Sequence, residues 1–250
     1  MAAQPRRSSA YSVLVASNDE EIRAALRLRH TVFAEEMGAR LHSSVPGLDV
    51  DEFDEHCDHL VVRDDTTGAT VGTYRLLPPG RASRLYSETE FDLSALEPLR
   101  GHLLEAGRSC VHPDHRGGAV INLMWTGIAR YLHLRGHRWL AGCASVPVTD
   151  GGTATRCVWE LARTQHLSPP RLRVRPHHPY LVDQESTVDR ATLLAAVPPL
   201  LRGYLRLGAW ICGEPAYDPA FNVADFFVLL SLDRVNPRYL DHFLGTGARG

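Results

Sequence analysis

The stretch that most constrains this chain spans residues 104–122 and reads LEAGRSCVHPDHRGGAVIN. Its apolar start predicts a strand, which runs into a short basic turn with two glycines and then into a helical pattern. The first N–H groups of a helix lack intrahelical partners, and the helix dipole is positive there. This order of elements therefore offers a phosphate access to the main chain. The glycines alone are equally compatible with an ordinary tight corner.

Strand and helix patterns alternate along the rest of the chain. Residues 59–64 and 69–78 flank the turn DTTG and predict an antiparallel hairpin. A loop at 38–56 is long enough to indicate function or mobility. Further strands are expected at 11–16, 103–111, 138–147, 209–215 and 225–232, an extended segment at 169–180, and helices at 20–36, 119–135, 153–166, from 198 or 199 onward, and within 236–244.

This mixture predicts an α/β (α+β) fold, a sandwich of three layers with helices on both faces of a twisted, mixed, mostly antiparallel sheet. A doubly wound nucleotide-binding fold would place its glycines after the first strand, whereas here they follow the fourth. Residues 1–10 are polar and predict a disordered tail. Residues 11–250 are expected to form a single domain with a C-terminal extension.

The charge pattern excludes several classes of protein. The net charge is −2 and the chain contains no lysine, so Schiff-base chemistry and a lysine-type Walker loop are excluded. No nucleic-acid partner is expected, because there is no general excess of positive charge. An acidic protein partner would therefore have to bind a local patch of positive charge. Such a patch is predicted at 171–175, where alternation places three arginines on one face, with solvent-facing arginines as the alternative.

The cysteines and histidines indicate neither a disulfide framework nor a metal site. The five cysteines are scattered and form no C-x-x-C pair, and the thirteen histidines form no recognisable ligand motif. A reducing cytoplasm is the expected compartment. No uncharged apolar stretch approaches the roughly 20 residues needed to span a bilayer, so membrane contact is expected only at the surface, at the inner face of the membrane.

Six longer motifs stand out along the chain: RHTVFAEEMG (29–38), DEFDEHCDHLVV (51–62), GTYRLLPP (72–79), YSETEFDLS (86–94), LEAGRSCVHPDHRGGAVINLMWTGIARYL (104–132) and LLRGYLRLGAWICGEPAYDPAFNVADFFVLL (200–230). They resemble the ornithine-lipid synthase family of the GNAT superfamily, the L-ornithine N(alpha)-acyltransferase type, also called hemolysin-like N-acyltransferases. They cover most of residues 29–230 in the order expected for that family. A more distant resemblance to acyl-homoserine lactone synthases rests on R-x-x-V-F, D-x-x-D, R-L-L-P and E-x-x-R.

The resemblance implies a GNAT-like fold and transfer of a fatty acyl group, often 3-hydroxylated, to the α-amine of an amino acid, usually ornithine. The implied donor is acyl-phosphopantetheine on acyl carrier protein, or acyl-CoA, and no permanently bound cofactor is implied. Alternatives are another acceptor amine, as in other N-acyl amino acids or homoserine-lactone signals, and a catalytically silent domain that binds acyl carriers. The oligomeric state is left open.

Three residues are candidates for catalysis. An amine that attacks a thioester must lose a proton, and the resulting oxyanion needs hydrogen-bond donors. Glu105 is the first candidate for a base or an amine-positioning carboxylate, with Arg108 and Asp54 beside it. Regular strand geometry would point residues 105 and 108 to opposite faces, so a direct pair would require a bulge. A Glu–Arg pair that only stabilises the fold is the alternative.

Four further residues are candidates for substrate binding. Asp51, like Asp54, could bind the ammonium group of an amino acid, and Arg75 could hold its carboxylate through a bidentate contact. Arg29 and Phe33 lie one helical turn apart and could close over the substrate. Solvated loop acids, a surface arginine and core packing of the phenylalanine are the respective alternatives.

The donor is expected at the glycine turn and at the end of the strand before it. A main-chain N–H near Cys110 or Val111 is the expected oxyanion donor. Cys110 is not expected to be a nucleophile, because no histidine is fixed beside it and direct aminolysis needs no acyl-enzyme. The candidate donor-binding residues are Cys110, Val111, Arg116, Gly117, Gly118 and Ala119.

Overall fold

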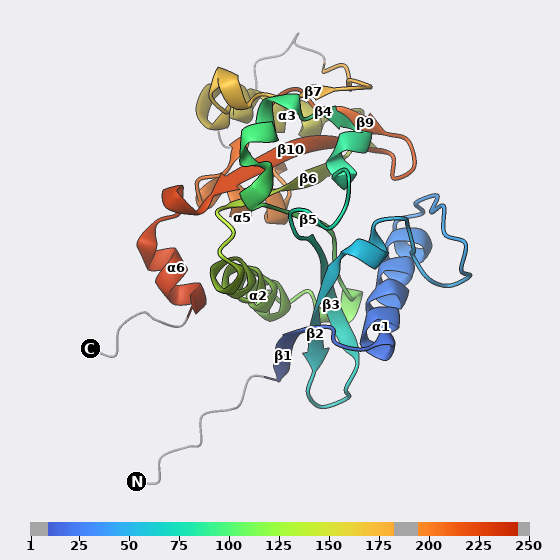
Figure 1. Cartoon of the computed structure of the whole chain (residues 1–250). Helices are drawn as coiled ribbons and strands as arrows, with labels where there is room; N and C mark the ends of the chain where they lie inside the picture. The colour runs from blue at the N-terminus through green and yellow to red at the C-terminus, as the bar shows by residue number, and fades with distance from the viewer. Residues whose placement is uncertain (1–9, 183–194, 245–250) are drawn as a thin grey trace, which may run out of the picture.

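The computed structural model describes residues 10–182 and 195–244. Nearly all of the tail expected at residues 1–10 lies outside these ranges. An eight-stranded sheet and a set of helices account for most of the described chain (Figure 1). Within these residues, no helix combines the length and the apolar character needed to cross a membrane.

The large sheet is mixed and mostly antiparallel, as the sequence predicts. Its strands run in the order β1-β2-β3-β5-β6-β10-β8, with β9 paired to β10, and among them only β5 and β6 pair in parallel. A second sheet pairs β4 (Phe91–Asp92) with β7 (Arg175–Pro176). The strands of the large sheet are β1 Tyr11–Val15, β2 Asp58–Asp64, β3 Thr70–Leu77, β5 Leu103–Val111, β6 Trp139–Pro147, β8 Trp210–Ile211, β9 Ala216–Asp218 and β10 Val223–Ser231.

Helices cover both faces of the sheet, which confirms the predicted layers (Figure 1). A Cβ on Gly72 of β3 would lie 2.7 Å from Val120, so this face packs against α2. Cys110 of β5 packs against Leu28 and Val32 of the opposite layer, which α1 forms. The helices are α1 (Asp19–His30), α2 (Ala119–Arg135), α3 (Thr153–Leu161), α5 (Pro199–Arg206) and α6 (Pro237–Leu244).

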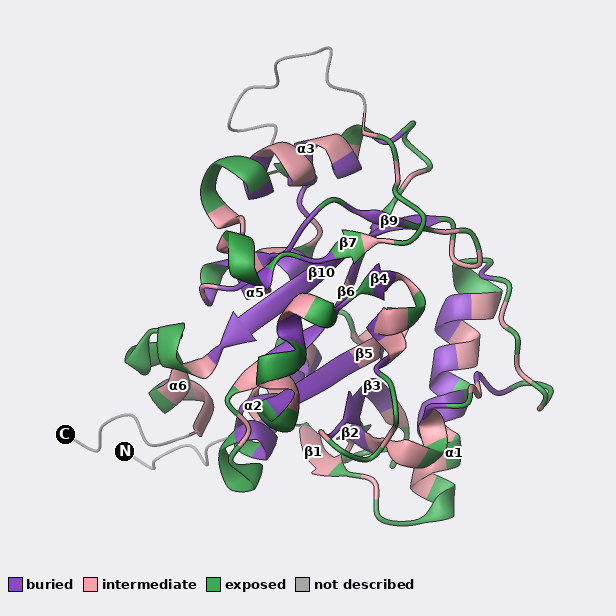
Figure 2. Ribbon diagram, turned by 45° about the horizontal axis from the view of Figure 1, so that its top comes forward, coloured by how far each residue is buried: buried purple, intermediate pink, exposed green. Residues whose placement is uncertain are grey.

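The core lies along the central strands, where β10 is buried from end to end (Figure 2). Alternate residues of β10 point into two clusters: Val228 and Leu230 pack on the α2 side, and Phe227 and Leu229 on the other. Short 3-10 segments, including Tyr86–Thr89 and Ser94–His102, cover that second side. The continuous apolar run at the end of the chain is therefore explained by burial on both faces.

Several expected elements differ in detail. The helix expected at 20–36 is α-helical only to His30 and continues as a π-helical segment, Thr31–Glu36. The helix expected at 153–166 changes in the same way at Ala162. The segment expected to be extended at 169–180 begins instead with a 3-10 turn, Pro170–Leu172, because consecutive prolines at 169 and 170 fix the backbone there.

The sheet divides between β5 and β6. These strands pair only from Leu103 to Glu105, opposite 139–141. A Cβ at Gly142 of β6 would lie 2.1 Å from the carbonyl oxygen of Ala106 in β5. The two backbones can therefore approach each other at this point only because residue 142 is glycine. Beyond it β5 stays with β3 and β6 stays with β10, which leaves a gap within the sheet.

Candidate active site

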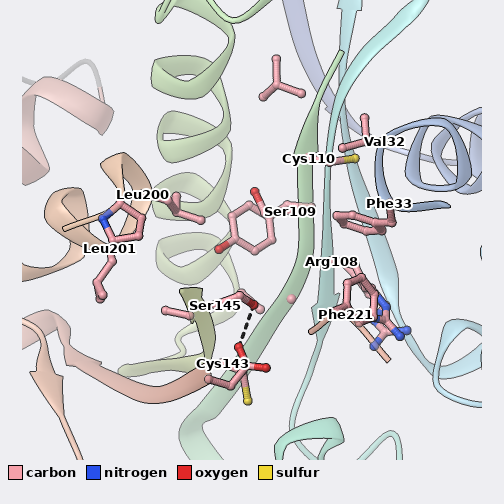
Figure 3. A pocket seen from close by; sticks show the side chains of 18 of the residues that line it. Val32, Phe33, Arg108, Ser109, Cys110, Cys143, Ser145, Leu200, Leu201 and Phe221 are labelled. Atoms are coloured by element: carbon pink, nitrogen blue, oxygen red, sulfur yellow. Dashed lines mark hydrogen bonds between the residues drawn. The ribbon is translucent and has the colours of Figure 1, made fainter. Parts of the chain in front are cut away.

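The gap between β5 and β6 contains a cavity of about 740 Å³. In Figure 3, Phe33, Arg108 and Phe221 lie on one side of it, and Leu200 and Leu201 on the other. Six further candidates from the sequence line it: Arg75, Glu105, Cys110, Val111, Arg116 and Gly118. The cavity therefore joins the glycine turn to the strand that carries Glu105.

A bulge at Arg108 shapes the middle of the cavity. Arg108 has a φ of 52°, and the pairing of β5 with β3 shifts there, so that residues 108 and 109 together lie opposite Tyr74. This is the irregularity that a contact between Glu105 and Arg108 would require. The two side chains nevertheless form no ion pair; the Arg108 guanidinium instead lies between the rings of Tyr86 and Phe221, 5.0 and 4.9 Å from their centroids.

Glu105 is held by the main chain of a neighbouring segment. Its carboxylate accepts the N–H groups of Tyr86 at 2.7 Å and Ser87 at 2.8 Å, and the residue is only 4% exposed. Burial raises the pKa of Glu105, although these hydrogen bonds oppose the rise. Each carboxylate oxygen has a second lone pair, so the group can still accept a proton from the cavity.

Arg29 and Asp54 belong to a buried ion-pair network. Arg29 is fully buried and donates to Asp49 at 2.7 Å and to both oxygens of Asp54, at 2.6 and 3.1 Å. Burial alone would raise the pKa of Asp54, but Arg29 and Arg75 lower it to about 2. Arg29 and Asp54 do not line this cavity. Asp54 is therefore a weak base that fixes the 49–54 loop rather than a group facing substrate.

Asp51 joins this network to the cavity wall. It accepts from Arg75 and, at 3.2 Å, from Arg108. Three arginines thus meet three aspartates, Asp49, Asp51 and Asp54. The charged side chains of this network that the sequence predicted to contact substrate therefore largely neutralise one another.

The glycine turn opens into the cavity beside α2. Gly118 has a φ of 88° and caps the helix, and the cavity wall continues from it to Ile121 and Asn122. Gly117 and Ala119 are not part of that wall. Arg116 forms a bidentate pair with Glu36 at 2.7 Å, so a phosphate would have to compete for this guanidinium.

Cys110 lacks the surroundings of a nucleophile. It is 6% exposed and lies in an apolar cluster with Leu28 of α1 and with Val32 and Phe33 of the π-helical segment that follows. Burial raises the pKa of its thiol to about 12, so the thiolate is scarce at neutral pH.

A second cavity, of about 450 Å³, adjoins the first. Residues 40–42 and 49–53 of the long loop line it, together with residues 216–221 from β9 and the turn after it. Six residues line both cavities and form the boundary between them: Phe53, Tyr86, Glu90, Arg108, Asp218 and Phe221. Among these, only Arg108 was a candidate from the sequence.

Three carboxylates gather at this boundary. Oxygens of Glu90, Asp218 and Asp225 lie within 4.8 Å of one another, a geometry that could also hold a metal ion. Glu90 follows the Tyr86–Thr89 turn, Asp218 is the last residue of β9, and Asp225 lies in β10. Sequence reasoning missed them because Glu90 is far in the chain from the other two, and because the pairing of β9 with β10 is what brings Asp218 close to Asp225.

Glu90→Gln is expected to raise the melting temperature, and more so as the pH rises from about 5 to 9. Burial, then Asp225 and Asp218, raise the pKa of Glu90. A carboxyl whose folded-state pKa exceeds its unfolded value stabilises the fold below the unfolded pKa, and that stability is lost as the pH rises through the folded pKa. Glutamine does not ionise, so the variant does not lose stability in this way as the pH rises. Calorimetric melting across this range, with the exposed Glu97→Gln as control, checks this; a pH-independent difference would contradict it.

The α2 and α5 side of the cavity is apolar. Trp125 lines it and packs edge-on against Tyr204, with ring centroids 4.5 Å apart. Other apolar residues there are Ile121, Pro198, Pro199, Leu200 and Leu201. This wall could accommodate an aliphatic chain.

The arginine stripe at 171–175 is present. Arg171, Arg173 and Arg175 are exposed, and Leu172 and Val174 between them are buried. The predicted alternation is thus confirmed, although the segment begins as a 3-10 turn. Docking of an acyl carrier protein there stays a prediction.

Comparison with known proteins relates this geometry to a family. Residues 28–126 match the model of an acetyltransferase (GNAT) domain. L-ornithine N(alpha)-acyltransferase of Rhodobacter capsulatus is 37% identical, covering 97% of each chain, and that of Brucella abortus is 34% identical, covering 95% of this chain and 90% of its own. The structure of BjaI, a CoA-dependent acyl-homoserine lactone synthase with SAM and isopentyl-CoA, is 18% identical with a TM-score of 0.55, covering 95% of this chain and 89% of that one.

Proposed function

Because this chain belongs to the L-ornithine N(alpha)-acyltransferase family and is an acyltransferase, we propose that it moves a fatty acyl group from a pantetheine thioester to the α-amine of ornithine. The observation that carries this proposal is the cavity that runs from the glycine turn through the gap between β5 and β6 and shares six lining residues with a second cavity. Donor and acceptor can therefore approach the bulge at Arg108 from opposite sides.

The donor lies on the side of α2 in this proposal. Main-chain N–H groups at residues 116–119 bind the pantetheine phosphate, where the positive end of the helix dipole adds to the attraction. The acyl chain lies against the apolar wall around Trp125 and Leu200. We take acyl carrier protein as the principal donor, with acyl-CoA as the alternative, and the arginine stripe at 171–175 as its docking face.

The acceptor enters through the second cavity. Its α-carboxylate binds Arg108, which reaches both cavities. The α-amine attacks the thioester carbon, so a C–N bond forms and the C–S bond breaks. Glu105 takes the proton from the amine and returns it to the departing sulfur, while a main-chain N–H near Cys110 or Val111 stabilises the oxyanion.

The reaction takes place in the cytoplasm in this proposal, where the thioester donors are made. Its product carries a long acyl chain and a charged head group, which favours release to the inner face of the membrane.

A screen of acceptors tests the function. The purified protein is mixed with a 3-hydroxyacyl carrier protein and, in separate wells, ornithine or one of the twenty common amino acids, and released thiol is measured. Ornithine is expected to give the fastest release, with an N-acyl-ornithine detected by mass spectrometry. Faster release with another amine would reassign the acceptor, and a faster reaction with acyl-CoA would reassign the donor.

A further inference from the structure

Three carboxyl groups meet beside the boundary between the two cavities, and none has a basic partner in the described part of the protein; burial and mutual repulsion raise the pKa of Glu90 and of Asp225. Asp225 is 3% exposed and accepts a hydrogen bond from Ser145 at 2.7 Å, drawn as a dashed line in Figure 3. Asp218 accepts the N–H groups of Ala220 at 2.7 Å and Phe221 at 3.2 Å. No arginine or histidine of the described residues forms an ion pair with Glu90, Asp218 or Asp225.

Glu90 is the least satisfied of the three. Both of its carboxylate oxygens are shielded from solvent, and their polar neighbours are the thiol of Cys143 and the carboxyl of Asp225 rather than an N–H group or a basic side chain. Most buried polar atoms of folded proteins are paired, and an unpaired buried carboxylate is costly. The nearby aspartates of the ion-pair network differ, because arginines balance them. Glu90 therefore has carboxyl and thiol neighbours but no basic partner among the described residues, at a place that both cavities reach.

We infer that Glu90 and Asp225, with Asp218 beside them, bind the side-chain ammonium of the acceptor diamino acid. This inference rests on the proposed function, since it names the residues by which the enzyme would select a diamino acid as the acceptor. An alkylammonium has three N–H donors and no acceptor, which suits a group of three carboxylates. Arg108 on the same boundary takes the α-carboxylate, so the two ends of the acceptor are recognised by opposite charges.

The test compares ornithine with norvaline, which has the same carbon chain but lacks the terminal ammonium. Values of kcat and KM for both amino acids are measured for the wild type, Glu90→Gln, Asp225→Asn and the exposed control Glu97→Gln. The wild type is expected to prefer ornithine by about 30-fold or more in kcat/KM, the range seen when one partner of a buried charge pair is removed. Both cluster variants should lose most of this preference through a higher KM for ornithine, with kcat for norvaline changed less than about twofold.

Other results would overturn the inference. An equal loss with both amino acids would make the carboxylates catalytic or structural, since norvaline offers no side-chain charge. Abolition of ornithine turnover by a chelator would indicate a metal ion in the cluster. A wild type without preference for ornithine would remove the need for any ammonium site.

Direct binding separates this inference from the proposed function. Calorimetric titration with ornithine and with norvaline, without donor, reports recognition alone. Weaker ornithine binding in Glu90→Gln supports the ammonium site even if no acyl-ornithine forms, in which case only the proposed function fails. Unchanged ornithine binding in both cluster variants would overturn the ammonium site even if acylation proceeds.

Discussion

Replacing Glu105 with glutamine is expected to lower kcat for ornithine acylation by about 100-fold or more, the usual contribution of a positioned general base. The carboxylate lies on the cavity wall at the point where β5 leaves β6, and burial raises its pKa toward the range useful for accepting a proton. Glutamine keeps the shape and one acceptor oxygen but cannot take the proton. Steady-state kinetics across pH check this, because the wild-type kcat should fall at acidic pH as Glu105 protonates, and the variant should lose that limb.

A structural contribution must be separated from this loss. Glutamine cannot accept both the Tyr86 and the Ser87 N–H, so a destabilisation of about 1–3 kcal/mol is expected. Glu88→Gln is the matched control, since that side chain accepts the Leu85 N–H in the same segment and does not line either cavity. A Glu105→Gln enzyme with wild-type kcat, or with the acidic limb intact, would remove Glu105 from proton transfer.

Replacing Arg29 with methionine is expected to destabilise the protein by about 3–5 kcal/mol, because it leaves buried carboxylates without their partner. The guanidinium is fully buried and binds Asp49 and Asp54 at once. For a chain of this size the melting temperature should fall by roughly 10 °C. Chemical denaturation at pH 7 measures the change in unfolding free energy directly.

A surface pair provides the comparison. Arg163 and Glu160 form an ion pair at 2.8 Å with both side chains exposed, so Arg163→Met should cost less than about 1 kcal/mol. Adding Asp54→Asn to Arg29→Met should restore part of the lost stability, since it removes one unpaired charge. Equal effects of Arg29→Met and Arg163→Met would show that the buried network does not hold the 49–54 loop.

Local patterns predicted the part of the site that is continuous in the chain. The strand at 103–111 and the helix at 119–135 have the expected bounds, because the apolar start of the strand, the glycine turn and the final Gly136 are local signals in the sequence. The hairpin of β2 and β3 follows for the same reason. The site residues on these elements, from Glu105 to Gly118, therefore lie along one cavity wall.

Charge pairing between distant segments could not be predicted in the same way. Asp54, Arg29 and Arg75 were expected to face substrate, and their mutual ion pairs depend on how α1, the 49–54 loop and β3 pack together. The acidic cluster at Glu90 required the registers of β9 and β10. The π-helical segment at 31–36 also escaped prediction, because helical periodicity does not distinguish it from an α-helix.

The most direct test of the account is a crystal structure with a non-cleavable acyl-pantetheine thioether. The account predicts the phosphate at the main-chain N–H groups of residues 116–119, the pantetheine arm in the gap between β5 and β6, and the carbonyl carbon beside the bulge at Arg108. A donor bound outside that gap, with its phosphate away from the glycine turn, would contradict it.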